Sequence, residues 1–123
     1  MKYFTKKDFF DAFSEVHEKK ENLVVIQSGI VSFAQHINCN ILKIPNYLIE
    51  VIFEYFGSET TILFPSFTSN FASTRKYDLF LSKPDTGTLP TYCLQNKLMK
   101  RTKQPLTSFL VKGPLESEIL RIK

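Results

Sequence analysis

The sequence predicts an α/β domain in which a mixed or mostly parallel sheet is flanked by helices. Short apolar segments at residues 23–27, 60–65 and 107–112, bounded by turn-forming residues, are typical of buried strands. Longer amphipathic segments at 6–17 and 46–56 alternate with them, as expected for an α/β chain. The 123 residues, 43% of them hydrophobic, suffice for one domain with a real core.

Composition and charge narrow the functional class. The net charge is only +4, and the basic residues are scattered among acidic ones, which does not indicate nucleic-acid binding. We see no secretory leader and no apolar run near the ~18–20 residues that cross a bilayer, so we expect a cytoplasmic protein without membrane contact. Cys39 and Cys93 are too few for a disulfide framework or a zinc site, so we expect reduced thiols and no metal. Residues 1–123 show no internal boundary.

The first element expected is a helix over residues 6–17. Thr5 is a good N-cap, and Asp8 three residues later completes a weak capping box. Phe4 and Phe9 occupy the two positions of a hydrophobic staple. The phenylalanines that follow share one helical face, which predicts packing on the body of the domain.

The next expected element is an interior strand beginning at Leu23. The run Leu23–Ile26 is apolar on both faces, which is typical of a strand covered on each side. Gln27, Ser28 and Gly29 follow at its carboxyl end, where open α/β sheets bind ligands. An ordinary strand-to-loop turn is the alternative reading. Further on, residues 30–35 are expected to begin a short helix, and residues 38–40 form a turn signal.

A helix and a strand follow in the central part of the chain. Pro45 suits a first helical turn, and residues 46–56 are apolar except for a stripe formed by Asn46, Glu50 and Glu54. We therefore expect a helix buried on most sides, with Gly57 just past its end. A buried strand then runs to Pro65, and a hydroxyl-rich loop containing Ser66 and Thr68 follows at its carboxyl end.

The C-terminal third contains the stretch that first suggests a ligand. Residues 71–83 lack a clear pattern, 89–98 are expected to be helical, and 115–122 form a last short helix. The segment 100–113 begins with the basic residues Lys100, Arg101 and Lys103, passes Thr102 and Ser108, and enters a strand. Cations and hydroxyl groups just before a strand can hold an anion. A solvated loop that leads into an edge strand has the same pattern.

Four motifs in this order resemble those of the aminoglycoside 3-N-acetyltransferase family. They are Val25–Ile30, Gly57–Thr68 (GSETTILFPSFT), Tyr77-Asp78 with Gly87 and Leu89 downstream, and Arg101–Phe109 with Gly113. Together they cover about residues 20 to 114. Family members run to roughly twice the length of this chain, so the resemblance implies an incomplete half of a larger three-layer fold.

The resemblance implies a function and a set of site residues. The family transfers acetyl from acetyl-CoA to an amino group of an aminosugar, and it includes antibiotic-resistance enzymes. By resemblance, the acetyl-CoA and substrate cleft would be lined by Ser28, Gly29, Ser66, Thr68, Arg101, Thr102 and Ser108. Arg101 would pair with a phosphate or hold its loop through an acidic residue.

The chain also departs from the family in ways that bear on catalysis. Gln27 and Gln104 stand where family members have histidine, and the family's histidine base lies in the half that has no counterpart here. His17 and His36 do not match that position. The expected function is therefore a truncated or split acetyltransferase with little activity alone, which self-associates or pairs with a complementary C-terminal half. The alternative is a non-catalytic binding or interaction module that retains these loops.

Overall fold

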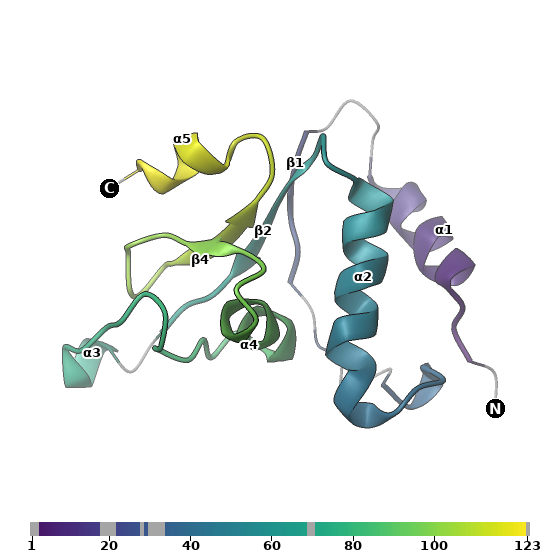
Figure 1. Ribbon diagram of the computed structural model, residues 1–123, viewed down its shortest axis with the longest axis horizontal. Coiled ribbons are helices and arrows are strands. Elements are labelled where there is room, and N and C mark those ends of the chain that lie inside the picture. Colours follow the sequence, from purple (N-terminus) through teal and green to yellow (C-terminus); the bar gives the residue numbers. More distant parts are fainter. Residues whose placement is uncertain (1–2, 18–21, 28, 30–33, 69–70, 123) are drawn as a thin grey trace.

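A mixed four-stranded sheet organises the molecule. The computed structural model describes residues 3–17, 22–27, 29, 34–68 and 71–122. The strands are β1 (Leu23–Val25), β2 (Thr61–Pro65), β3 (Lys100–Arg101) and β4 (Phe109–Lys112), in the spatial order β1-β2-β4-β3. β1 runs parallel to β2, whereas β4 is antiparallel to both β2 and β3. The predicted mixed sheet with flanking helices is confirmed (Figure 1).

The helices pack around this sheet to form one core. They are α1 (Lys6–Val16), α2 (Ile44–Phe56), α3 (Phe71–Thr74), α4 (Thr88–Gln95) and α5 (Glu116–Leu120), with 3-10 turns η2 (Ala34–His36) and η3 (Ile41–Lys43). α2 and α4 contribute the core residues Leu48, Ile52, Leu89 and Cys93, which meet Ile62, Phe64 and Leu110 from β2 and β4. Figure 1 shows α1 beside α2, at the opposite end of the molecule from α3 and α5.

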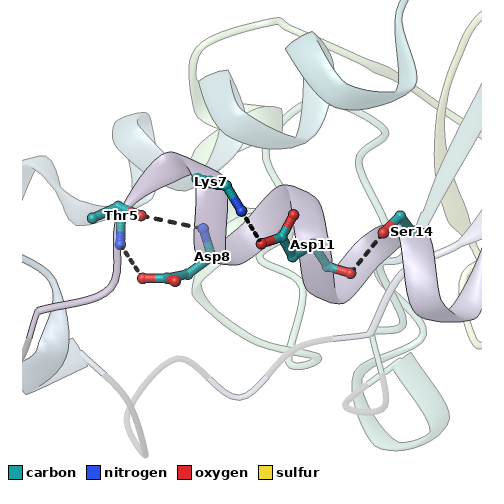
Figure 2. A network of polar contacts seen from close by, with 5 residues as sticks. All are labelled: Thr5, Lys7, Asp8, Asp11 and Ser14. Atoms are coloured by element: carbon teal, nitrogen blue, oxygen red, sulfur yellow. Dashed lines mark hydrogen bonds and ion pairs between the residues drawn. The ribbon is translucent and has the colours of Figure 1, made fainter.

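The start of α1 is held by the predicted local interactions. The Thr5 hydroxyl accepts from the Asp8 N–H at 3.2 Å, and the Asp8 carboxylate accepts from the Thr5 N–H at 2.8 Å (Figure 2). Each of these bonds satisfies an N–H group that the helix itself leaves without a partner. Phe4 and Phe9 meet edge to face with ring centroids 6.0 Å apart, so the staple forms as well.

α2 is the buried helix that the sequence predicts. Pro45 lies in its first turn, and the Gly57 N–H donates to the Phe53 carbonyl at its end. The stripe of Asn46, Glu50 and Glu54 is exposed, whereas the opposite face is buried in the core. α1 covers part of the remaining surface through aromatic contacts, since the Phe13 and Tyr55 ring centroids lie 5.2 Å apart.

The prediction of an interior strand at Leu23 is wrong in one respect, because β1 is an edge strand of the sheet formed by the described residues. Within the described residues its only neighbour is β2. Val24 and Ile26 pack against the core, but Leu23 is 42% exposed and Val25 is 59% exposed. Alternate residues of a strand point to opposite faces, so one face of β1 is covered and the other is open.

Several boundaries differ from the prediction. β3 was not expected, and the basic segment at Lys100 is strand rather than loop. α4 ends at Gln95, three residues early, and a single helical turn, α3, lies in the stretch expected to be irregular. No helix in the described ranges is long and apolar enough to cross a membrane.

Candidate functional site

One end of the sheet gathers the loops that the sequence singles out. Because β1 and β2 are parallel, the residues after each strand emerge at the same end. β4 runs the other way, with Phe109 opposite Pro65, so the segment before β4 lies at this end too. Gly29 follows β1 and is exposed, whereas Ser28 lies outside the described residues.

Ser66 and Ser108 join the loop after β2 to the loop before β4. The Ser66 N–H donates to the Ser108 carbonyl at 2.9 Å, and the Ser108 hydroxyl donates to the Ser66 carbonyl at 2.7 Å. Their two Oγ atoms are 3.1 Å apart, and both residues are fully buried. These hydroxyls therefore bond within the protein rather than facing solvent.

Arg101 occupies the centre of this cluster and is only 3% exposed. Nη2 donates to the Ser66 carbonyl at 2.6 Å and to the Thr68 hydroxyl at 2.7 Å. Nη1 donates to the Ser82 carbonyl at 2.5 Å, and Nε donates to the Ser108 hydroxyl at 3.3 Å. Burial lowers the pKa of Arg101, an effect opposed by Tyr77 and Asp85.

Thr68 completes the buried cluster, and Thr102 is buried next to it in the chain. The Thr68 N–H donates to the Pro105 carbonyl at 3.0 Å, which ties the loop after β2 to the segment before β4. The Thr102 hydroxyl accepts from the Phe109 N–H at 3.0 Å, and the Thr102 N–H donates to the Phe109 carbonyl at 2.9 Å. Four of the seven predicted site residues thus bond to one another: Ser66, Thr68, Arg101 and Ser108. Thr102 follows Arg101 in the chain and bonds to Phe109 instead.

The segment that begins with the third motif contributes residues that were not predicted for the site. The Asp78 carboxylate accepts from the Phe80 and Leu81 N–H groups at 2.8 and 2.9 Å, and the Ser82 hydroxyl accepts from the Asp78 N–H at 2.7 Å. This turn places the Ser82 carbonyl against Arg101. The only signal in the sequence was the Tyr77-Asp78 pair, which carries no indication of its distant partner.

An open groove lies directly beyond this cluster. It has a volume of about 620 Å³ and is lined by Lys83, Pro84, Asp85, Gly87, Thr88 and Thr91. The lining segment is anchored to the loop after β2, since the Asp85 N–H donates to the Phe67 carbonyl at 2.9 Å. The Thr86 hydroxyl also donates to the Pro65 carbonyl at 2.5 Å. Among the described residues, the groove therefore combines a cation, Lys83, with the N-terminus of α4.

The two histidines lie outside the cluster and pack against aromatic rings. His17 packs against Phe56 with centroids 5.1 Å apart, and His36 lies 5.1 Å from the Phe4 ring. Cys39 is exposed and Cys93 is buried, both as free cysteines, and burial raises the pKa of the Cys93 thiol to about 12. In the described part of the chain, no cluster of three or more His, Cys, Asp or Glu could hold a metal ion.

Comparison with known proteins identifies the fold. No protein-family profile and no curated protein matches the chain. Among solved structures, aminoglycoside acetyltransferase AAC(3)-IVa, as the apoenzyme, is similar with a TM-score of 0.79 at 20% identity, over 100% of this chain and 46% of that one.

Two similar structures contain ligands. AAC-IIIb in a binary complex with CoASH has a TM-score of 0.70 at 14% identity, over 97% of this chain and 49% of that one. AAC-VIa bound to sisomicin has a TM-score of 0.72 at 13% identity, over 98% of this chain and 50% of that one. The chain thus spans about half the length of the structures it matches. The resemblance inferred from the four motifs is confirmed at the level of the fold: this chain has the fold of aminoglycoside 3-N-acetyltransferases over about half their length.

Proposed function

We propose that this chain supplies the acetyl-CoA-binding loops of an N-acetyltransferase that acts on an amino group of an aminosugar. The observation that carries the proposal is the convergence of motif residues, from Ser66 to Ser108, at one end of the sheet. The fold likeness supports the same reading, since one similar structure contains CoASH and another contains an aminoglycoside.

The groove beside the cluster has chemistry that suits the anionic part of coenzyme A. Lys83 supplies a positive charge, and the first N–H groups of α4 near Thr88 have no partner within the helix. Phosphate groups favour such a combination of lysine and helix N-terminus. Asp85 lies on the same rim and would disfavour an anion there, so we expect the phosphates to lie toward Lys83 and Thr88.

The acyl transfer requires a neutral amine, which attacks the thioester carbonyl carbon as the coenzyme A thiolate leaves. A base must accept the proton of the amine, and this contributes about 10²–10⁴-fold. Gln27 and Gln104 cannot do so near neutral pH, because an amide side chain takes up no proton there. These loops would therefore position acetyl-CoA, which by itself accelerates transfer only in part.

We propose that the remaining elements of the acetyltransferase fold pack against the free edge that β1 has among the described residues. Leu23 and Val25 leave an apolar surface exposed, and an unpaired strand edge readily accepts another strand. Because the similar structures are about twice as long, we propose that a polypeptide carrying their remaining elements covers this edge. A second copy of this chain would instead give a concentration-dependent dimer in sedimentation experiments.

The second candidate is a binding module without catalysis, and binding and turnover assays separate the two. Calorimetry with acetyl-CoA should give saturable binding, and Lys83→Gln should weaken it about tenfold, as expected for one charge-assisted contact. Lys43→Gln, at an exposed lysine in η3, is the matched control and should leave the affinity unchanged. No heat at millimolar acetyl-CoA would refute the proposal. Binding without acetylation of any aminosugar, even with the complementary half added, would favour the binding module.

A further inference from the structure

Arg101 bonds to three of the segments that meet at this end of the sheet, in addition to the bonds that these segments make with one another. Its guanidinium group bonds to the loop after β2 at Ser66 and Thr68, to the segment before β4 at Ser108, and to the turn at Ser82. These four partners come from three segments that are far apart in the sequence.

The hydrogen-bond acceptors of Arg101 differ from those of an arginine that binds an anion. All four acceptors are neutral carbonyl or hydroxyl oxygens, and Arg101 is 3% exposed. The guanidinium carbon also lies 4.9 Å from the centre of the Tyr77 ring. The Tyr77 hydroxyl in turn donates to the Thr102 carbonyl at 3.1 Å, so the ring covering the cation is itself anchored beside it. An arginine with this many internal partners has little capacity left for a ligand phosphate.

The segment that Arg101 holds continues directly into the groove. The Ser82 carbonyl accepts from Nη1, and the next residue, Lys83, lines the groove. On the other side, Asp85 is tied to Phe67, which lies between the two residues bonded by Nη2. The position of the groove wall therefore depends on the same contacts that hold the loop after β2.

We propose that Arg101 is a positioning residue: it sets the geometry of the groove wall and of the loop after β2 without touching the ligand. This inference rests on the proposed function only where it concerns acetyl-CoA. A lysine cannot replace it, because a single ammonium group lacks the planar fork that reaches several acceptors at once. If Arg101 bound a phosphate by its charge, lysine would preserve much of the affinity.

The test combines hydrogen exchange with acetyl-CoA calorimetry on Arg101→Lys. The matched control is Arg121→Lys, the same substitution at an exposed position after α5. We expect the Thr68 N–H in Arg101→Lys to exchange about tenfold faster or more, a larger change than at Ile62 within β2. Acetyl-CoA affinity should fall about tenfold, with no change in the control. A milder variant, Thr68→Val, removes one acceptor and should show both effects in smaller measure.

Each result decides the inference. Affinity lost while the Thr68 N–H stays protected would mean that Arg101 contacts the ligand directly, and the inference would be wrong. Faster exchange with unchanged affinity would mean that these loops do not position acetyl-CoA, which also overturns it. If the wild-type chain binds no acetyl-CoA, the proposed function fails separately, and exchange in Arg101→Lys still decides whether Arg101 organises the loops.

Discussion

The turn after β4 makes a sharp prediction, because Gly113 has almost no room for a side chain. A Cβ added there would lie 2.5 Å from the Thr61 Cα and 2.8 Å from the Thr60 carbonyl oxygen. Both are backbone atoms of the β2 region, so neither moves away easily. The φ angle of +135° is also one that residues with a side chain rarely adopt. The close approach is used structurally, since the Leu115 N–H donates to the Thr61 hydroxyl at 2.9 Å.

Two other glycines allow backbone strain and overpacking to be measured separately. Both effects should lower the free energy of unfolding in Gly113→Ala. Gly57 has a φ of +69° but open space around an added Cβ, so Gly57→Ala measures backbone strain alone, about 1–3 kcal/mol. Overpacking against β2 adds about 1–3 kcal/mol in Gly113→Ala, for roughly 2–6 kcal/mol in all. At Gly29 neither effect operates, so Gly29→Ala should be neutral or slightly stabilising.

The assay is chemical denaturation followed by circular dichroism, with the free energy of unfolding compared across the three variants. The expected order of stability is Gly29→Ala, then Gly57→Ala, then Gly113→Ala. The free energy of unfolding of such domains is about 5–15 kcal/mol, so Gly113→Ala should lose a large part of the stability. If Gly113→Ala proved as stable as Gly57→Ala, the packing of the turn after β4 against β2 would be wrong.

Three further predictions concern the core, the thiols and catalysis. Ile52→Asp puts a charge without a partner into the α2 face of the core and should cost several kcal/mol, so an unchanged melting temperature would contradict the packing of α2. With a thiol reagent at pH 8, exposed Cys39 should react at once and Cys93 only on unfolding, because burial raises the pKa of Cys93 to about 12; equal rates in the native protein would refute this. The chain alone should release thiol from acetyl-CoA far more slowly than about 1 s⁻¹ with any aminosugar, whereas faster turnover abolished by His17→Ala or His36→Ala would place the base within this chain.

The local elements were the most predictable part of the fold. The ends of α1 and α2 depend on residues a few positions apart, such as Thr5 with Asp8 or Phe53 with Gly57, so their chemistry is visible in the sequence. β2 was also predictable, because a strand covered on both faces is apolar throughout.

β1 shows the limit of that reasoning. Its residues are as apolar as those of a covered strand, but exposure depends on which strands and helices lie beside it. β3 was missed for a related reason. Two residues, one of them a lysine, carry no strand pattern, and they are a strand only because β4 offers its backbone alongside.

The sequence by itself determined which segments to single out: through their resemblance to the family's motifs, Ser66, Thr68, Arg101 and Ser108 were predicted as site residues without any structure. Only the tertiary structure decided what these residues do. Their hydrogen bonds join positions that are up to 42 residues apart, and no local pattern encodes such a pairing. An arginine among threonines and serines looks the same in a sequence whether it faces a phosphate or four carbonyl and hydroxyl oxygens. The packing of the sheet buried Arg101 and thereby settled which partners its five N–H groups could reach.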